Sequence, residues 1–265
     1  MKTVINSKYK ENVSYIERIP NGVERDGEVI RDQRNVLHKV EVDDKKWVVK
    51  RYKRPNSFNR WMYTFFRRSK ARRSYEYALR LQEAGFGTAD PVAYIEIKRK
   101  GLFHTGYFVS EYLPCSLLKE VDSYDEPERN RILDAFACHT AAMHEKGIVH
   151  YDYNPENIFF YEENGEFRFA MIDINRMRFK KPSRRKAVRS LKSLGLAMPS
   201  LVRVTERYAI ERGLNPELIS GAVLVKRSMH WKHKFKQDIK SLFRRFEEPW
   251  EEPRRKWVEK GSVVR

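Results

Sequence analysis

Short apolar runs with the period of β-strands dominate the chain between residues 27 and 112. Strands are predicted at residues 29–30, 36–42, 47–52, 92–97 and 106–112. Polar turns at residues 43–46 and 98–101 lie between them, as expected for strands joined by tight connections. Residues 1–20 show no clear period. We therefore predict a β-sheet region in the first part of the chain.

Apolar residues at helical spacing predict helices at residues 55–68, 69–84 and 126–146. Gly85 and Gly147 follow the last two, at the position where glycine commonly ends a helix. The first helix carries an aromatic and apolar set between arginines and a lysine: Phe58, Trp61, Met62, Phe65 and Phe66. Two interpretations of it stay open. It packs its apolar face on the domain, or it lies on a membrane surface as a basic amphipathic helix.

Strands return after the third predicted helix. Residues 159–161 and 167–172 are separated by a segment that contains Asn164-Gly165, a pair that strongly favours a β-hairpin. From Arg176 to about Phe246 the chain is predicted to be helical and is rich in basic residues. We expect the charged tail at 247–265 to be mobile.

The composition fits a folded domain in a reducing compartment. Hydrophobic residues make up 41% of the 265 residues, which is ample for a core. The longest apolar runs fall far short of the roughly 20 residues that span a bilayer, and residues 1–20 lack the pattern of a signal peptide. Cys115 and Cys138 are too few for a disulfide framework, and we expect both to be buried. These features predict a cytoplasmic protein.

The net charge of +18 indicates an anionic partner. Solubility alone requires a much smaller excess of charge in a domain of this size. The classes of partner that fit are nucleic acid, an anionic membrane surface, and a phosphorylated or acidic substrate.

The strongest chemical pattern lies between the helix at 126–146 and the hairpin. His150, Asp152 and Asn157 have the H-x-D-x-x-x-x-N spacing of a phosphotransferase catalytic loop. In that loop the Asp receives the proton of the acceptor hydroxyl, and the Asn holds a metal ion. Asp173 follows the hairpin directly and adds a carboxylate, which is a preferred ligand of Mg²⁺. The sequence therefore predicts a phosphoryl-transfer site.

Lys50 and Glu76 are candidates for the contact with nucleotide phosphates. Lys50 ends an apolar strand, on the same face as Val48 and Tyr52, and resembles the strand lysine that binds phosphates in kinases. A solvent-exposed lysine at a strand end has the same pattern. Glu76 has two candidate partners: Arg80, in a weak i,i+4 surface pair, or Lys50, which the carboxylate would hold toward the phosphates.

These elements occur in the order found in one family. The chain carries Val48-Val49-Lys50, Glu76, His150-x-Asp152-x-x-x-x-Asn157 and Ile172-Asp173-x-Asn175-Arg176. Over roughly residues 27–215 it resembles the bacterial lipopolysaccharide core kinases, including the Kdo and heptose kinases, and their protein-kinase-like fold. The resemblance implies an α+β fold of two lobes. Residues 1–112 would form an N-lobe with an antiparallel sheet and one key helix, and residues 113–265 a mainly helical C-lobe.

The same resemblance implies ATP and Mg²⁺ as cofactors and assigns a role to each candidate residue. Asp152 would be the catalytic base. Lys50, held by Glu76, would contact the phosphates, and Asn157 and Asp173 would bind the metal. Val48 would contact the nucleotide, and Glu111 and Leu113 would lie at the hinge, where backbone groups bind adenine. His150 is expected to orient the metal-binding segment and not to act as a base.

Departures from the regulated protein kinases narrow the expected substrate. No G-x-G-x-x-G precedes Lys50, Tyr151 replaces the arginine of H-R-D, and Asp173 is followed by neither the glycine of D-F-G nor an A-P-E. These differences favour a constitutive kinase of a small molecule or glycolipid. They disfavour an enzyme that is switched by phosphorylation of an activation segment.

The residues after Asp173 bear on the acceptor. Between Arg176 and Lys192 the chain has basic residues and no acidic ones: Arg176, Arg178, Lys180, Lys181, Arg184, Arg185, Lys186, Arg189 and Lys192. A basic approach suits an acceptor with carboxylates or phosphates, such as an anionic glycolipid precursor of lipid A-core. A later segment from Trp231 to Phe246 has apolar residues among basic ones. It either packs on the domain or lies against an anionic membrane.

The sequence therefore favours an ATP-dependent kinase of a Kdo or heptose hydroxyl in the lipopolysaccharide inner core. It would be cytoplasmic and peripheral on the inner membrane. Nucleic acid is the disfavoured partner. The alternatives are a kinase of another small molecule or of protein Ser/Thr, and a pseudokinase that only binds anionic partners.

Overall fold

A computed structural model describes residues 1–32 and 35–225. Residues 1–223 form one compact unit, and a second unit begins at Leu224. The helix predicted around Trp231 to Phe246 and the tail at 247–265 lie outside the described residues. None of the helices that the structure describes has both the length and the apolar character needed to cross a bilayer.

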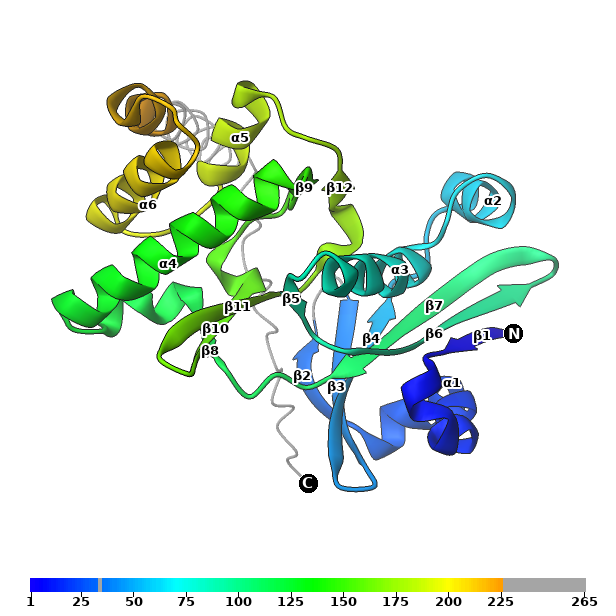
Figure 1. Ribbon diagram of the computed structural model, residues 1–265. Helices are drawn as coiled ribbons and strands as arrows, with labels where there is room; N and C mark the ends of the chain where they lie inside the picture. The colour runs from blue at the N-terminus through cyan, green and yellow to red at the C-terminus, as the bar shows by residue number, and fades with distance from the viewer. Residues whose placement is uncertain (33–34, 226–265) are drawn as a thin grey trace, which may run out of the picture. The chain divides into compact units, whose positions relative to one another are not determined.

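Within the described part of the chain, the first 111 residues contain an antiparallel six-stranded sheet (Figure 1). Its strands lie in the order β1-β6-β7-β4-β3-β2. Their bounds are β1 Lys2–Ile5, β2 Glu28–Asp32, β3 Asn35–Val42, β4 Lys45–Tyr52, β6 Pro91–Arg99 and β7 Leu102–Glu111. All the strands predicted between residues 27 and 112 are present, and β1 is an additional strand on the edge beside β6.

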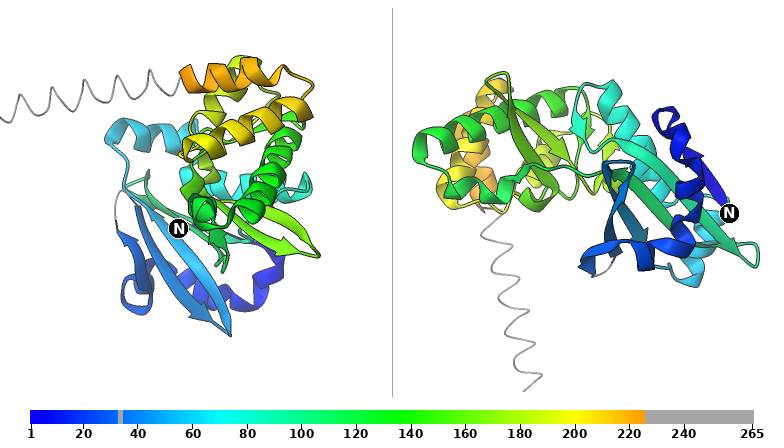
Figure 2. Two further views of the ribbon diagram at one scale, coloured as in Figure 1. Left: turned by 90° about the vertical axis from the view of Figure 1, so that its left-hand side faces the viewer. Right: turned by 90° about the horizontal axis from the view of Figure 1, so that it is seen from below.

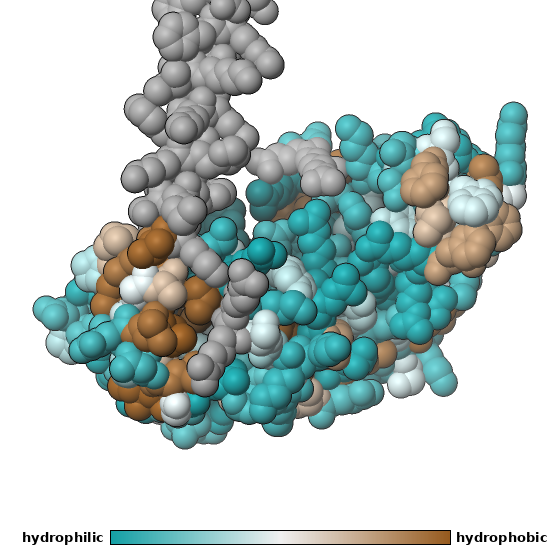
Figure 3. Space-filling view, turned by 90° about the horizontal axis from the view of Figure 1, so that it is seen from above, coloured by the Kyte–Doolittle hydropathy of each residue, from teal (hydrophilic) through white to brown (hydrophobic). Residues whose placement is uncertain are grey.

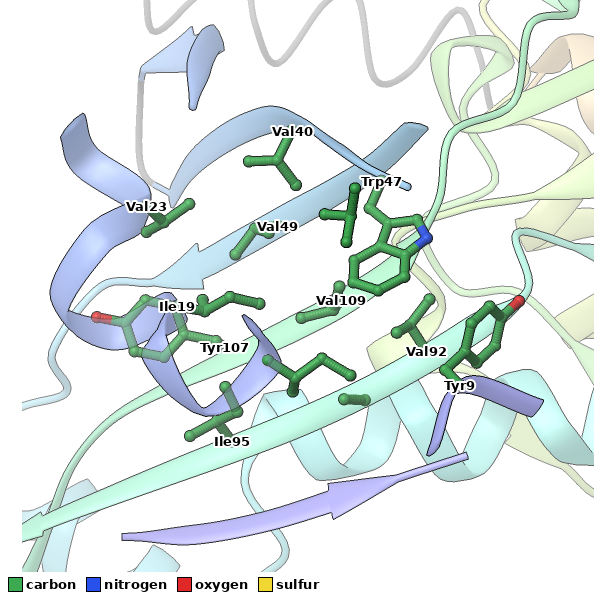
Figure 4. Packing of buried hydrophobic residues seen from close by; sticks show 13 residues of the cluster. Tyr9, Ile19, Val23, Val40, Trp47, Val49, Val92, Ile95, Tyr107 and Val109 are labelled. Carbon is green, nitrogen blue, oxygen red and sulfur yellow. The ribbon is translucent and has the colours of Figure 1, made fainter. Parts of the chain in front are cut away.

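One face of this sheet packs against a helix that the sequence pattern missed. After the 3₁₀ turn η1 (Ser7–Asn12), helix α1 (Val13–Asp26) buries Ile16, Ile19 and Val23 against Trp47 and Val49 of β4 (Figure 4). The three buried residues do have helical spacing, but the stripe is narrow and its last member lies beyond residue 20, so the first 20 residues alone show only a weak period. Pro20, inside the helix, further weakens the local signal.

Helix α3 (Lys70–Glu83) covers the other face, opposite α1 (Figures 1 and 2). Its ends are those predicted: the Ser69 side chain accepts a hydrogen bond from the Arg72 amide, and Gly85 has φ = 79° after the last turn. Helix α2 (Ser57–Phe65) precedes it, within the predicted 55–68 segment. The alternation along β4 therefore sends Trp47 and Val49 toward α1, and Val48 and Lys50 toward the opposite side.

A smaller sheet and a set of helices follow. The sheet has the order β5-β11-β10-β8, and α4 packs against β11 and α6. The elements are β8 Ser116–Leu117, η2 Leu118–Ser123, α4 Glu126–Glu145, β9 Ile148–Val149, η3 Pro155–Asn157, β10 Ile158–Glu163, β11 Glu166–Met171, η4 Ile174–Arg176, β12 Arg178–Phe179, α5 Arg184–Leu191, α6 Met198–Glu211 and a helix at 216–225. The predicted hairpin is β10–β11, and Asn164 and Gly165 both have positive φ in its turn.

The short strand β5 (Gly87–Thr88) connects the two sheets. It comes from the first 112 residues, yet it pairs in parallel with β11 of the smaller sheet. The antiparallel sheet and the helix-rich second part confirm the predicted two-lobed α+β architecture. The lobe boundary after residue 112 remains a prediction. Both cysteines are free thiols and half-buried, so the expectation that they are fully buried was wrong.

Candidate active site

A cavity of about 350 Å³ lies between the inner face of the six-stranded sheet and the start of the second part of the chain. Its size is in the range of small-molecule and cofactor sites. Val48, Lys50 and Tyr52 of β4 line it together, as their shared strand face predicts. The last two residues of β7, the two residues after it (112 and 113) and Asp173, which follows β11, also line it. Residues separated by more than a hundred positions therefore meet around one space.

The charged centre of the cavity is an ion pair between Lys50 and Asp173. The Lys50 Nζ donates to Asp173 Oδ1 at 2.5 Å, and the two side chains are 14% and 30% exposed. Burial disfavours the charged lysine, but its interactions with Tyr52 and Asp173 outweigh burial and raise the Lys50 pKa. Burial likewise acts against the Asp173 carboxylate, and Lys50 overcomes it and lowers the Asp173 pKa. Both groups are therefore charged at neutral pH.

Asp173 is held in an uncommon backbone conformation. Its φ of 53° and ψ of 36° place it in the left-handed region, which aspartate tolerates better than most residues. The buried Asn175 donates from Nδ2 to Asp173 Oδ1 at 2.7 Å. Lys50 and Asn175 thus both bind Oδ1 and fix the orientation of the carboxylate. The motif contained Asn175, but sequence reasoning assigned it no role. Its position two residues after Asp173 was the available signal that its side chain could bond to the aspartate carboxylate.

His150 connects its own loop, the predicted catalytic loop, to the segment that contains Asp173. Its Nδ1 accepts a hydrogen bond from the Asp152 amide at 3.1 Å, so its Nε2 must carry the proton that it donates to the Ile172 carbonyl at 3.0 Å. Burial lowers the His150 pKa, which favours this neutral form. The two bonds fix the loop against the residue that precedes Asp173. This geometry supports a structural role for His150, and its effect on metal binding stays a prediction.

The loop from His150 to Asn157 holds the Asp152 and Asn157 side chains in different environments. The Asn157 Nδ2 donates to the Asp152 carbonyl at 3.0 Å, and the Asn157 carbonyl accepts from the Ile172 amide at 2.9 Å. The Asp152 side chain is 46% exposed, and its Oδ2 lies 3.9 Å from the Arg176 guanidinium. Asn157 is therefore fixed between Asp152 and Ile172, the residue before Asp173. The Asp152 carboxylate, by contrast, remains accessible to an incoming hydroxyl group.

The structure contradicts the expected pairing of Glu76 with Lys50. Glu76 accepts hydrogen bonds from Arg68 and Arg72, both at 2.7 Å, and it does not line the cavity. The reason is the rotation of α3: Ser74 faces the cavity, and Glu76 lies two residues, or about 200°, further around the helix. The alternative partner Arg80 was wrong as well, because the i,i+4 pair forms with Arg72 instead.

Replacing Glu76 by glutamine is therefore expected to change kcat/KM by less than about threefold. The change removes a partly exposed surface charge and leaves the Lys50–Asp173 pair intact. Steady-state kinetics of the purified variant would check this. A loss of activity comparable to that of a Lys50→Met variant would show that Glu76 reaches Lys50 during turnover.

The end of β7 and the residue that follows it are anchored by contacts with other segments. The Glu111 amide donates to the Asp90 carbonyl at 2.9 Å, and the Tyr112 amide donates to the Lys46 carbonyl at 2.8 Å. The Glu111 carboxylate accepts from the Tyr9 hydroxyl at 2.8 Å, a contact that sequence reasoning missed because Tyr9 is far away in the chain. Within the residues that the structure describes, the Leu113 amide makes no hydrogen bond. It is a donor available at the cavity wall.

Comparison with known proteins identifies the family. Residues 22–208 match the model of the lipopolysaccharide kinase (Kdo/WaaP) family. A solved structure described as WaaP in complex with acyl carrier protein is 22% identical. The match covers 88% of this chain and 99% of that one with a TM-score of 0.59, which shows a shared fold. A second solved structure is the Rio2 kinase in an ADP/Mg²⁺-phosphoaspartate complex from Chaetomium thermophilum, which is 16% identical. That match covers 91% of this chain and 81% of that chain, with a TM-score of 0.47.

The family match confirms the predicted resemblance and the predicted enzyme class, a phosphotransferase that acts on a hydroxyl group. The matched residues include every predicted site residue from Lys50 to Asp173. The chain belongs to the lipopolysaccharide kinase (Kdo/WaaP) family.

Proposed function

We propose that the protein transfers a phosphoryl group from ATP to a sugar hydroxyl of the lipopolysaccharide inner core, on a Kdo or heptose residue. The observation that carries the proposal is the position of the Lys50–Asp173 pair. It lies in a nucleotide-sized cavity and is joined through His150 and Asn157 to the loop that presents Asp152. Phosphoryl transfer needs mainly positioning and charge stabilisation, and this arrangement provides both.

The proposed nucleotide site has a donor and an apolar wall. Leu113 offers its amide to the adenine edge, and Val48 lies on the β4 face that forms the wall of the cavity. Ile30 of β2 and Leu37 of β3 also line the cavity. This strand pair would cover the nucleotide, the role that a glycine-rich loop has in regulated protein kinases. Lys50, with its ammonium already directed by Asp173, would contact the phosphates.

The residues present fit a magnesium ion. The hydrogen bonds that Asp173 receives from Lys50 and Asn175 both end on Oδ1, so among the described residues Oδ2 is left to bind a cation. Asn157 uses its Nδ2 as a donor, which leaves its side-chain oxygen. Carboxylate and amide oxygens, completed by phosphate oxygens and water, are the ligands that Mg²⁺ prefers. Asp173 and Asn157 would hold the ion, which would supply positive charge to neutralise the nucleotide phosphates.

Asp152 is the proposed base because of its exposure and its place in the loop. Its carboxylate is accessible, and the hydrogen bonds of its amide and carbonyl fix its backbone. It would accept the proton of the attacking sugar hydroxyl. Arg176 lies beside it, at the start of the basic segment that we propose to bind carboxylates or phosphates of the acceptor. An anionic glycolipid at the cytoplasmic face of the inner membrane has this chemistry.

Mass spectrometry of lipid A-core from cells with and without the protein tests this function. Cells that produce the protein are expected to carry one additional phosphate on a core sugar, because the sugar hydroxyl is the proposed acceptor. Cells that produce Asp152→Ala should match cells without the protein. In vitro, labelled ATP offered with glycolipid, small molecules and proteins separates the alternatives. Label that appears on a protein and not on glycolipid would contradict the proposal.

A further inference from the structure

Helix α2 displays a cluster of aromatic side chains that the rest of the described chain does not cover. Phe58, Trp61, Phe65 and Phe66 are 67%, 46%, 63% and 68% exposed. Trp61 contacts both Phe65 and Phe66, with ring centroids 6.1 and 4.8 Å apart. Figure 3 shows the resulting hydrophobic patch over α2, at the right of the view. We call these four residues the aromatic face.

The opposite side of α2 is fixed to the sheet. The Arg60 Nε donates to the Phe103 carbonyl at 2.8 Å, and the Thr64 hydroxyl accepts from the Phe103 amide at 2.8 Å. Tyr63 also packs edge-on against the Phe103 ring, at the base of β7. Helix α2 is therefore attached through one side, and the side that it presents outward is apolar. This is the reverse of an ordinary surface helix, which buries its apolar side.

The surroundings of the aromatic face are strongly basic. Residues 53–73 contain basic residues and no acidic ones: Lys53, Arg54, Arg60, Arg67, Arg68, Lys70, Arg72 and Arg73. The nearby acid Glu76 is occupied by two of these arginines. Exposed aromatic rings among cations match the interfacial region of an anionic bilayer. There the rings enter the boundary with the acyl chains and the cations face the lipid headgroups.

A bilayer fits this feature better than a folded partner does. None of the residues of α2 is buried, so the aromatic face projects outward and forms no groove. A protein partner would need a matching hollow, whereas lipid headgroups deform around a projection. The family's substrate class is a glycolipid, which is itself a membrane component.

We propose that the aromatic face of α2 inserts into the interface of an anionic phospholipid bilayer and anchors the kinase there. The inference rests on the proposed function in one respect. The anchor would bring the basic segment after Asp173, which we propose to bind the acceptor, close to a glycolipid in the membrane. Helix α2 leads directly into α3, whose Tyr77 packs on Phe179 in the segment after Asp173. Anchoring through α2 therefore constrains the position of that segment relative to the membrane.

The test is cosedimentation of the full-length protein with vesicles, without ATP or acceptor. The wild type is expected to bind phosphatidylglycerol–phosphatidylethanolamine vesicles, to bind less at higher salt, and to bind phosphatidylcholine vesicles weakly. The double variant Phe58→Ser/Phe65→Ser should partition at least roughly tenfold less. The matched control Tyr161→Ser removes an exposed aromatic residue from β10 and should bind as the wild type does.

A double variant that binds these vesicles as tightly as the wild type would overturn the proposal. So would a wild-type dimer that the double variant loses, because a second copy would then be the occupant. Circular dichroism checks folding, and Arg67→Glu provides a second variant that leaves the rings in place. Weaker binding by this variant, with a shallower salt dependence, is the expected result, and unchanged binding would count against the proposal.

Activity assays separate this inference from the proposed function. The double variant should phosphorylate a deacylated, water-soluble core acceptor at the wild-type rate, and vesicle-embedded glycolipid more slowly. A wild type that binds vesicles through α2 but phosphorylates neither acceptor would refute the proposed function and leave the anchor standing. Equal rates on both acceptors for both proteins would refute a role of the anchor in presenting the substrate.

Discussion

Replacing Asp152 by alanine is expected to lower kcat by about 10²–10⁴-fold, the range that a positioned general base contributes. The substitution removes the carboxylate that would accept the hydroxyl proton. ATP binding should be nearly unchanged, because the Lys50–Asp173 pair and the Leu113 amide lie elsewhere in the site. Single-turnover kinetics measure the first effect, and titration calorimetry with a non-hydrolysable ATP analogue measures the second.

Glu156 supplies a matched control for Asp152. It is an exposed carboxylate on the same loop, four residues further along, and its side chain has no proposed role. Glu156→Ala should therefore keep the wild-type kcat. If Asp152→Ala retains full activity, or if the two variants lose activity equally, the assignment of Asp152 as the base is wrong.

Replacing Asp173 by asparagine is expected to lower activity by at least about 10²–10³-fold, as the loss of one electrostatic group in a preorganised site does. The change removes the carboxylate that would bind the metal and leaves the largely buried Lys50 without its counter-charge. Wild-type protein should be stabilised more by ATP with Mg²⁺ than by ATP alone in a thermal-unfolding assay. The variant should lose this difference.

Asp134 supplies a matched control for Asp173. Its replacement breaks an ion pair elsewhere in the chain and leaves the proposed metal site unchanged. It pairs with Arg203 through hydrogen bonds of 2.8 and 2.6 Å, and it does not line the cavity. Asp134→Asn also exchanges a paired carboxylate for an amide, and it should keep its activity and its response to Mg²⁺. An Asp173→Asn variant that still responds to Mg²⁺ as the wild type does would remove Asp173 from the metal site.

Local patterns predicted much of the fold where the structural cause is itself local. Ser69 and Gly85 mark the ends of α3 because helix caps depend on a few neighbouring residues. Asn164-Gly165 predicted the β10–β11 hairpin because both residues accept positive φ. Helix α1 was missed because its apolar stripe is narrow and Pro20 lies inside it, so the local helix signal is weak although the three buried residues have helical spacing.

In the candidate site, too, contacts within one loop could be predicted and contacts between distant segments could not. Asp152 and Asn157 are five residues apart, and the bond from the Asn157 side chain to the Asp152 carbonyl closes within one loop. Their association could therefore be predicted from spacing. The hydrogen bond from Tyr9 to Glu111 could not be predicted in this way, because 102 residues separate the two and no local pattern connects them.

Spacing and order alone were thus enough to select the strand with Lys50, the loop from His150 to Asn157 and Asp173, which the fold brings together. The partner of Lys50 was decided by the tertiary structure. Each residue of a helix turns the side-chain direction by about 100°, so the packing of α3 determines which residue faces the cavity. That packing places Ser74 at the cavity, where it bonds to Tyr52, and Glu76 toward Arg68 and Arg72. Likewise, the pattern of α2 left two interpretations open, and only the folded chain shows that its aromatic face lies exposed.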